Sequence, residues 1–501
     1  MIYSLDQKKP VVWTIAGSDS GGGAGIQADL HTFQDFAVHG CSVITALTAQ
    51  NSFALGYCVA TERKSVVAQI NALDSDMPAA AIKLGMLANA EIVETVIKYL
   101  DDYTGYVVCD PVMFTTTGGS LLDEEGSVLL RQMLPRIDLL TPNILEAETL
   151  TGLSIKSLDE VVVAAEAILA MGARSVVITG GHLDAQDGKR VDYWTDGKQA
   201  QWLSGEDIQT VNNHGTGCTF SSAVAAAIAQ SYDVKDALVI AKAYVTQGLR
   251  HSIQIGNGPG PVGHFGWPDM LEDLPTITST KPVAAPAAQF ASCGEALGLY
   301  PVVDSADWVT KLAALGVTTI QLRVKDKTEA ELRDEISRAI AACKAGNIRL
   351  FINDHWQLAI ELGAYGVHLG QQDLDSADLT AIANAGLRLG VSTHSYYEIA
   401  RAHGLRPSYI ALGPVYETTT KAMDFAPLGL DQLEEWVDLL GGDYPLTAIG
   451  GISYERVNDV LWTGVSSCAM VTAITEADDY QAVVTDLVER MQLLPAQELV
   501  D

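Results

Sequence analysis

Basic side chains are scarce in this chain of 501 residues, which has 31 lysines and arginines against 62 aspartates and glutamates. The resulting formal net charge of −31 repels nucleic acids and anionic membrane surfaces through its long-range field. We therefore expect no nucleic-acid partner and no membrane partner. Any phosphate group has to be bound by a small number of locally placed cations.

Cysteines and long apolar runs are scarce as well. The seven cysteines lack the paired spacing of metal ligands, and no apolar run is long enough to span a bilayer. The first ten residues include Asp6, Lys8 and Lys9 but no apolar core of a signal peptide. These absences indicate a reducing compartment, so we expect a cytoplasmic protein.

The chain is 48% hydrophobic and too long for one ordinary domain. In residues 269–292 neither helical nor strand periodicity persists, and three prolines stand among Thr, Ser and Ala. This segment reads as a linker, which predicts a first domain over residues 1–268 and a second over residues 293–501.

The first half alternates apolar strand candidates with alanine-rich helical stretches. The clearest strand candidates are residues 11–16, 106–109 and 175–179. This alternation predicts an α/β layered fold.

The second half contains eight strand-like runs separated by segments of helix length. They are residues 299–303, 318–324, 348–352, 366–369, 387–391, 409–412, 446–449 and 467–471. Eight alternations of strand and helix in a little over 200 residues predict a compact TIM (β/α)8 barrel.

Polar residues collect just after these strands, at the end where TIM barrels carry their functional groups. They are Arg323, Lys325, Asn353, Asp354, Asp373, Ser392, Thr418, Lys421, Gly451 and Thr472. Each alone can be read as part of a salt bridge or a solvated residue at a barrel rim, but the set together indicates a ligand site.

The residue types in this set suit a diphosphate. Arg323 and Lys325 alternate with Gln321 on one side of a strand, so both cations can reach a common anion. Asp354 and Asp373 supply hard oxygen ligands for a Mg²⁺ ion that bridges diphosphate oxygens.

Seven ordered motifs make residues 298–494 resemble the thiamine-phosphate synthases. They are QLRVK at 321–325, ND at 353–354, HLGQQD at 368–373, GVSTH at 390–394, GPVYETTTK at 413–421, AIGGI at 448–452 and VTAI at 471–474.

This resemblance implies a set of roles. An aminopyrimidine diphosphate is held by Gln321, Leu322, Arg323, Val324, Lys325, Asn353, Ser392 and Lys421, and Mg²⁺ is bound by Asp354 and Asp373. A thiazole phosphate is held by Thr418, Thr419, Thr420, Gly451, Val471 and Thr472. Arg323 and Lys421 stabilise the departing diphosphate, and no protein nucleophile is required.

In the first half, a glycine-rich stretch at 16–29 follows the first strand and opens a helix. Such turns are common, and by itself this one is a weak signal. The run Asn213-His-Gly-Thr-Gly-Cys218 precedes an alanine-rich helix, where successive N–H groups form an anion hole. Cys218 then falls in the first helical turn, where the dipole favours a thiolate. The alternative reading of Cys218 is a small core residue.

Two further junctions carry acidic groups. Asp110 ends an apolar strand, and Asn143 and Glu146 stand three residues apart at a strand-to-helix junction. These groups can organise Mg²⁺ on a nucleotide. A capped helix with a solvated Glu146 is the alternative for the second junction.

Residues 1–268 resemble the hydroxymethylpyrimidine and phosphomethylpyrimidine kinases of the ribokinase-like superfamily. The matching motifs are AGSDSGGGAGIQAD at 16–29, VITALTAQN at 43–51, KLGML at 83–87, DPVM at 110–113, TPNILEAE at 141–148, GGH at 180–182, HGTGCT at 214–219 and GPVGHF at 260–265.

The kinase resemblance implies that Asp29 and Gln50 hold the pyrimidine or its hydroxymethyl group, that Met86 lines the same pocket and that Cys218 acts as a base toward the attacking oxygen. MgATP is served by Asp110, Asn143 and Glu146, with Gly215, Thr216 and Gly217 as the anion hole. Thr179 stands where many relatives have a phosphate-contacting lysine, and residues 114–117 replace a Lys-Ser-like stretch. Both departures reduce the positive charge at the phosphates.

Together the two resemblances predict consecutive steps with small-molecule substrates. The first half phosphorylates hydroxymethylpyrimidine twice with ATP and Mg²⁺, and the second half couples the diphosphate to thiazole phosphate. We also expect a homo-oligomer. A rival reading makes the first half a weakened pyrimidine-binding or regulatory module. A sugar kinase is disfavoured, because Cys218 stands where sugar kinases have an aspartate.

Overall fold

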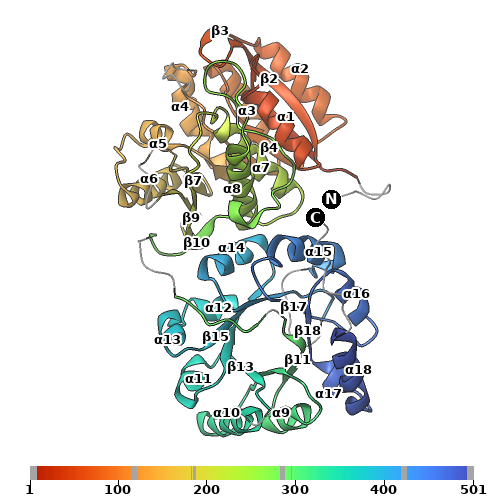
Figure 1. Ribbon diagram of the computed structural model, residues 1–501. Coiled ribbons are helices and arrows are strands. Elements are labelled where there is room, and N and C mark those ends of the chain that lie inside the picture. The colour runs from red at the N-terminus through yellow and green to blue at the C-terminus, as the bar shows by residue number, and fades with distance from the viewer. Residues whose placement is uncertain are drawn as a thin grey trace. The chain divides into compact units, whose positions relative to one another are not determined.

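The computed structural model describes residues 8–114, 121–181, 183, 188–282, 288–294, 296–344, 346–418 and 426–492. The chain divides into two compact units, Met1–Ala284 and Ala285–Asp501. Both units are of the α/β class (Figure 1). Among the described residues, no helix is both long enough and apolar enough to cross a membrane.

Ten strands of the described residues form one sheet in the first unit, in the order β10-β9-β8-β7-β6-β5-β4-β1-β2-β3. The strands are β1 (Val11–Asp19), β2 (His39–Gln50), β3 (Leu55–Ala60), β4 (Ala81–Leu84), β5 (Tyr106–Cys109), β6 (Leu139–Leu140), β7 (Val176–Ile178), β8 (Lys189–Thr195), β9 (Ala200–Glu206) and β10 (Thr276–Thr278). Neighbours from β7 to β2 are parallel, whereas β3 and the β8–β10 end are antiparallel.

Helices cover both faces of this sheet. They are α1 (Gly25–Asp35), α2 (Arg63–Asp74), α3 (Ala90–Leu100), α4 (Glu124–Met133), α5 (Ile144–Thr151), α6 (Leu158–Ala170), α7 (Thr216–Ala229) and α8 (Val234–Arg250), with the short 3-10 helices η1 (Leu134–Arg136) and η2 (Leu271–Asp273). Helices α1, α7 and α8 pack together on one face, and α2, α3, α4 and α6 lie on the other. The predicted α/β layered fold is confirmed.

The ends of the predicted linker are folded. Residues 271–278 belong to the first unit, where β10 pairs with β9 and Ile277 is buried opposite Leu203. At the other end, the Ala291 carbonyl accepts a hydrogen bond of 2.7 Å from the Ser408 hydroxyl in the second unit. The sequence showed no periodicity at 276–278 because an edge strand of three residues is too short to have one.

Eight strands of the described residues close into a parallel barrel in the second unit. They are β11 (Gly298–Val303), β12 (Thr319–Leu322), β13 (Arg349–Asn353), β14 (Gly366–Leu369), β15 (Arg388–Thr393), β16 (Tyr409–Leu412), β17 (Leu446–Ile449) and β18 (Ser467–Met470). Each overlaps one of the predicted runs, so the TIM barrel is confirmed.

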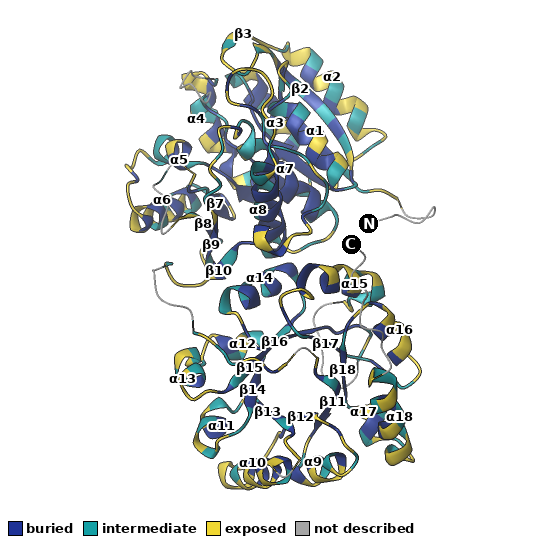
Figure 2. Cartoon of the chain, in the orientation of Figure 1, coloured by how far each residue is buried: buried dark blue, intermediate teal, exposed yellow. Residues whose placement is uncertain are grey.

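The barrel is surrounded by helices with buried inner faces and exposed outer faces, as α10 and α18 show in Figure 2. The helices are α9 (Ala306–Ala313), α10 (Glu329–Lys344), α11 (Trp356–Leu362), α12 (Gln371–Leu374), α13 (Leu379–Asn384), α14 (Tyr396–Leu405), α15 (Gly429–Leu440), α16 (Val457–Trp462), α17 (Thr472–Thr475) and α18 (Tyr480–Gln492). Helices α12 and α17 follow β14 and β18 directly.

Aromatic side chains fill the interior of the barrel. The Phe351 ring lies 5.9 Å from Tyr300 and 5.0 Å from Tyr409, measured between centroids. Glycines make room for these rings: a Cβ on Gly390 would lie 2.1 Å from Cζ of Tyr409, and one on Gly366 would lie 2.7 Å from the Phe351 ring. The interior is a packed core, which leaves the open ends of the strands for ligands.

Candidate active sites

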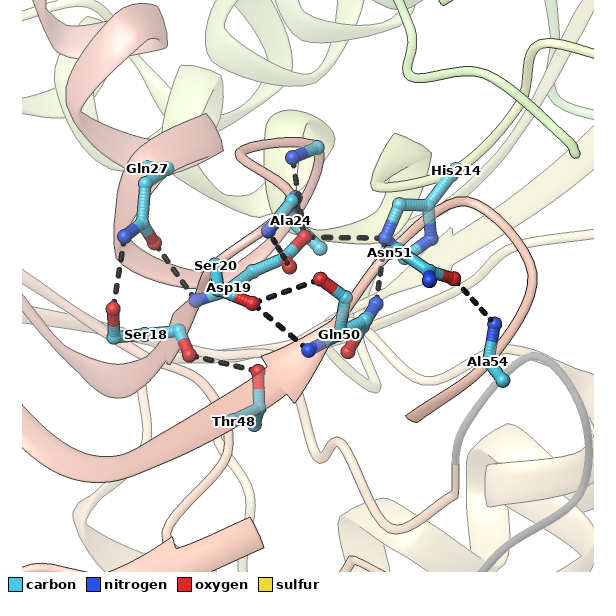
Figure 3. Close-up of polar contacts among 12 residues, drawn as sticks. Ser18, Asp19, Ser20, Ala24, Gln27, Thr48, Gln50, Asn51, Ala54 and His214 are labelled. Atoms are coloured by element: carbon cyan, nitrogen blue, oxygen red, sulfur yellow. Dashed lines mark hydrogen bonds and ion pairs between the residues drawn. The ribbon is translucent and has the colours of Figure 1, made fainter. Parts of the chain in front are cut away.

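The glycine-rich loop after β1 is organised by Asp19. The Asp19 carboxylate accepts hydrogen bonds from the N–H groups of Gly21 at 2.7 Å, Gly23 at 3.1 Å and Ala24 at 2.9 Å (Figure 3). Burial by itself raises the pKa of Asp19, but hydrogen bonds from His214 and these backbone groups leave it below its usual value. Because these N–H groups are already bonded to Asp19, they are not free to receive a phosphate.

His214 connects this loop to β2. Its Nε2 lies 2.9 Å from Nε2 of Gln50 and 3.3 Å from the Asp19 carboxylate (Figure 3). Gly215 has a φ of 83°, and a Cβ there would lie 1.9 Å from the carbonyl oxygen of Gly23. Only glycine fits this close approach, so the loop before α7 and the loop after β1 form one structure.

Met86 lies beside the same loop. Its Sδ is 3.1 Å from the position of a Cβ on Gly17, and Thr45 donates a hydrogen bond to its carbonyl. The predicted pyrimidine contacts Gln50 and Met86 therefore both border the glycine-rich loop, which is consistent with a pocket there.

Asp29 is placed differently from the predicted substrate contact. Its carboxylate accepts hydrogen bonds from Lys83 at 2.8 and 3.0 Å, from Thr14 at 2.5 Å and from Ser222 at 2.6 Å. Both charged side chains of the Asp29–Lys83 pair are 0% exposed. The carboxylate has no surface left for a ligand, so we correct its role to partner of Lys83 in the base of the site.

Cys218 and Asp110 lie in contact, with the thiol donating a hydrogen bond to the carboxylate. Burial raises the pKa of the Cys218 thiol to about 12, Lys83 opposes this shift, and Asp110 and Asp29 add to it. Cys218 is partly exposed, yet the surrounding protein raises the pKa of its thiol, which argues against the thiolate predicted from the helix dipole. Burial also raises the pKa of Asp110, to about 6.

Asn143 and Glu146 form a capping box at the start of α5, as the structural alternative predicted. Each accepts a hydrogen bond of 3.0 Å from the backbone N–H of the other. Glu146 is nevertheless buried rather than solvated, and burial together with the charge of Asp110 raises its pKa to about 8. Two neighbouring carboxyl groups whose pKa values are both raised suit a divalent cation.

The first turn of α7 faces these acids. Gly215, Thr216 and Gly217 lie at its N-terminus, and a Cβ on Gly217 would be 3.5 Å from the Asp110 carboxylate. The first N–H groups of a helix have no intrahelical acceptor, so this turn can bind an anion. Thr179 pairs with Asn143 through a short parallel bridge at the same edge. The predicted departure at residues 115–117 lies outside the described residues.

At the mouth of the barrel, the residues of the first predicted motif divide between two faces. Gln321 points inward, where its amide donates to the Tyr300 hydroxyl at 3.2 Å. Leu322 and Val324 are buried on the opposite, helix-facing side, because side chains alternate along a strand. These two residues can therefore contribute to a ligand site through their backbone. Arg323 is partly exposed and Lys325 is exposed.

A chain of hydrogen bonds runs through the barrel interior to Ser392. The Tyr300 hydroxyl lies 2.7 Å from the Tyr409 hydroxyl, which lies 2.6 Å from Nδ1 of His368. Nε2 of His368 is 2.8 Å from Oγ of Ser392. Burial and the nearby Arg323 lower the pKa of His368 to about 4, so its ring is neutral at physiological pH.

Asp354 and Asp373 lie within hydrogen-bond contact of each other. Asp354 is exposed, yet the surrounding protein takes its carboxyl partly out of water and raises its pKa, Asp373 raises it further, and Arg323 opposes the rise. Its φ of 62° is unusual for a non-glycine residue and marks a strained position of the kind found at functional sites.

This pair fits Mg²⁺, which commonly uses one or two carboxylates and takes its other ligands from water and substrate phosphates. In the described part of the chain no group of three or more His, Cys, Asp or Glu side chains forms a metal cluster. Asn353 precedes Asp354 at the end of β13 and is partly exposed.

The predicted thiazole-phosphate residues follow β16, β17 and β18. Gly451 has a φ of 66°, and a Cβ on it would lie 2.5 Å from the carbonyl of Glu417, so this loop touches the segment that leads to Thr418. Val471 and the exposed Thr472 stand at the start of α17. Thr419, Thr420 and Lys421 lie outside the described residues.

Several site residues were missed by the sequence reasoning. Lys83 is the one charge in an apolar strand, which is a usable signal for a buried functional or structural ion. His368 lies inside a quoted motif, but Tyr300 and Tyr409 have no local signal, because the barrel brings them together over 109 residues.

Comparison with known proteins supports both units. Residues 19–263 match the family model described as phosphomethylpyrimidine kinase, and residues 299–474 match the one described as thiamine monophosphate synthase. The thiamine-phosphate synthase of Photorhabdus laumondii is 56% identical over 202 residues, covering 40% of this chain and 93% of the relative.

A relative that spans both units is the probable chloroplastic thiamine biosynthetic bifunctional enzyme of rice, Oryza sativa subsp. japonica. It is 32% identical over 490 residues, covering 95% of this chain and 87% of the relative. A structure of pyridoxal kinase from Staphylococcus aureus with AMP-PCP and pyridoxal matches 54% of this chain and 98% of its own, with 31% identity and a TM-score of 0.50.

The class defined by the layered unit, the barrel and their matches is a pair of transferases joined in one chain. Because the rice relative aligns along nearly the whole length, the chain belongs to the family of bifunctional thiamine biosynthetic enzymes. It carries a phosphomethylpyrimidine kinase unit followed by a thiamine-phosphate synthase unit.

Proposed function

We propose that the first unit transfers phosphoryl groups from ATP to hydroxymethylpyrimidine and then to its monophosphate. The observation that carries this proposal is the contact of Cys218 with Asp110 at the first turn of α7. This arrangement brings a proton-transfer group, an acidic group and backbone N–H donors to one point.

All seven cysteines are free, which supports a cytoplasmic location.

In this proposal, Gln50 and Met86 hold the pyrimidine, and Gly215, Thr216 and Gly217 bind the transferring phosphoryl group through the backbone of α7. Asp110 and Glu146 hold Mg²⁺ on the nucleotide, with Asn143 fixing Glu146 through the capping box. An ion held there would supply charge neutralisation to the phosphates, where Thr179 provides no positive charge.

Cys218 takes the proton of the acceptor hydroxyl as the bond to phosphorus forms. Because burial raises the pKa of the thiol to about 12, little thiolate is present at neutral pH. Below that pKa, each increase of one pH unit raises the fraction of thiolate about tenfold. The chemical step therefore accelerates as the pH increases.

For the second unit, we propose that Gln321, Asn353 and Ser392 hold the aminopyrimidine while Arg323, Lys325 and Lys421 bind the diphosphate. Asp354 and Asp373 hold Mg²⁺, which supplies charge stabilisation to the leaving diphosphate.

Cleavage of the bond between the methylene carbon and the diphosphate oxygen leaves a pyrimidine cation, which the thiazole nitrogen then attacks. Positioning and charge stabilisation account for the rate, since no covalent enzyme intermediate is needed.

The thiazole phosphate is proposed to lie at the loops after the sixth, seventh and eighth strands. TIM barrels frequently bind phosphate between these loops and the start of a short extra helix, which here is α17. Thr418, Thr419, Thr420, Gly451, Val471 and Thr472 are the proposed contacts.

The test is to incubate the full chain with hydroxymethylpyrimidine, MgATP and thiazole phosphate and to follow every phosphorylated species by mass. We expect Cys218→Ala to abolish phosphorylation and leave coupling of supplied diphosphate intact, with Cys58→Ser as the control. Equal loss of both activities in Cys218→Ala would contradict the division of labour between the units.

Pyridoxal is a second candidate acceptor for the first unit, favoured by the match to the Staphylococcus aureus pyridoxal kinase. The same assay with pyridoxal in place of hydroxymethylpyrimidine distinguishes the two acceptors by their relative kcat/KM. Absence of turnover with either acceptor, while coupling proceeds, would instead favour a pyrimidine-binding or regulatory role.

A further inference from the structure

Hydrogen bonds inside the barrel join two of the side chains proposed to hold the pyrimidine. The first is Gln321 on β12, and the last is Ser392 on β15. Between them lie the hydroxyl groups of Tyr300 and Tyr409 and the ring of His368. We call these five residues the polar chain. Both tyrosines are 0% exposed, so bulk water does not reach their hydroxyl groups.

The donor of each bond in the polar chain follows from its first member. The Gln321 amide N–H donates to the Tyr300 hydroxyl oxygen at 3.2 Å. The proton of Tyr300 is then available for the Tyr409 oxygen at 2.7 Å, and Tyr409 in turn donates to Nδ1 of His368 at 2.6 Å. Each phenol places its proton on the next member, because an unpaired buried donor is costly.

This direction fixes the tautomer of His368. Burial lowers the pKa of the ring to about 4, so the ring is neutral and one of its nitrogens carries the proton. Since Nδ1 accepts from Tyr409, the proton is on Nε2, which donates to the Ser392 oxygen at 2.8 Å. The hydroxyl proton of Ser392, which is partly exposed at the end of its strand, is therefore available to a ligand.

The two ends of the polar chain consequently differ in kind. The nitrogen of the Gln321 amide faces Tyr300, which leaves its oxygen as an acceptor for a ligand, whereas Ser392 presents a donor. An aminopyrimidine has the complementary groups, because its amino group donates and its ring nitrogens accept. In the oxo analogue a carbonyl replaces the amino group and a ring nitrogen carries a hydrogen, so donor and acceptor are exchanged.

We propose that the polar chain makes the barrel selective for the amino form of the pyrimidine over the oxo form, with Tyr300, Tyr409 and His368 as positioning residues. Acceptance of the oxo form requires all four hydrogen bonds to reverse together, so the two ends cannot adapt separately. The inference rests on the proposed contacts of Gln321 and Ser392 with the pyrimidine.

The test compares the affinity of the full chain for thiamine phosphate, the coupling product, with its affinity for the oxo analogue of that product. Titration calorimetry measures binding alone and so avoids the different reactivity of the two pyrimidines. We expect the wild type to bind the amino form on the order of a hundredfold more tightly, because the oxo form opposes like groups at both ends. Excess thiazole phosphate should displace both compounds, which assigns the binding to the barrel.

Tyr409→Phe cuts the polar chain in its middle and keeps the aromatic ring in the barrel core. Because both ends can then adapt separately, the preference should fall about tenfold, chiefly through tighter binding of the oxo form. General damage to the fold would weaken both compounds instead. Tyr444→Phe is the matched control: its hydroxyl lies 3.0 Å from Nδ1 of the buried His403, outside the polar chain. It should leave the preference unchanged.

Circular dichroism shows whether each variant is folded. If Tyr409→Phe does not fold, Tyr300→Phe cuts the polar chain one bond earlier and should give the same fall in preference. An unchanged preference in the folded variant refutes the role of the polar chain. A wild type that couples its substrates but binds both forms equally overturns this inference alone, whereas a wild type that does not couple them overturns the proposed function as well.

Discussion

The buried Asp29–Lys83 pair allows a direct comparison of two roles for Asp29. If Asp29 binds the substrate, its replacement changes substrate affinity. If it neutralises Lys83, its replacement changes the stability of the first unit. The structure supports the second role, because Lys83 donates to the carboxylate at 2.8 and 3.0 Å and both side chains are 0% exposed.

The expected size of the effect follows from the burial. Asp29→Asn keeps a polar group for Thr14 and Ser222 but leaves the Lys83 charge uncompensated in the interior. Breaking one side of a buried pair costs about 3–5 kcal/mol. For a unit of this size, each 1 kcal/mol shifts Tm by about 2–4 °C, so we expect the Tm of the first unit to fall by roughly 6–20 °C.

The assay heats the full chain and follows kinase activity, with coupling activity of the barrel as the internal standard. The double variant Asp29→Asn, Lys83→Met should recover part of the loss, because it removes both charges. Lys64→Met is the control: its partner is Glu62, both side chains are mostly exposed, and such a pair is worth at most about 1 kcal/mol. If Asp29→Asn melts with the wild type while KM for hydroxymethylpyrimidine rises, our reasoning is refuted and Asp29 is a substrate contact.

Further predictions concern the barrel. Because Asp354 has a raised pKa, its deprotonation destabilises the metal-free protein as the pH rises, and protons compete with Mg²⁺ as the pH falls. Mg²⁺ should therefore raise the Tm of the barrel more at pH 8 than at pH 5; an equal gain at both would contradict the metal site. Arg323→Ala should remove about 2–4 kcal/mol of transition-state stabilisation from the coupling reaction, which slows it on the order of a hundredfold or more. The rate of phosphorylation should be unchanged. Unchanged coupling in that variant would discredit the diphosphate assignment. Gly390→Ala should destabilise the barrel by about 1–3 kcal/mol, since its Cβ would lie 2.1 Å from the Tyr409 ring. Gly442→Ala is the control, with open space around its Cβ, and equal thermal midpoints for the two variants would argue against the packing described here.

The barrel was readily predictable because its signals are local. Each strand is a short apolar run, and each polar motif follows its strand immediately, so the order of elements predicts where the strands end. The proximity of Asp354 to Asp373 then follows from the geometry of neighbouring parallel strands.

The ion pairing of Asp29 and the protonation state of Cys218 were less predictable, because both depend on the residues packed around these side chains. The sequence places Cys218 at a helix start, which favours a thiolate. Tertiary packing places the partly exposed thiol beside Asp110 and raises its pKa instead. Likewise, Lys83 is far from Asp29 along the chain, and only the β1–β4 pairing brings their strand and helix together.

The sequence by itself determined the two α/β units, the eight strands of the barrel and most of the residues at its mouth, since periodicity and motif spacing are local properties of the chain. Tertiary structure alone decided which polar groups are free. Asp29 is neutralised by Lys83, Leu322 and Val324 are buried, and Tyr300, Tyr409 and His368 form one chain of hydrogen bonds. The reason is physical: burial, ion pairing and hydrogen bonding depend on distances between residues remote in sequence, and these distances exist only after folding.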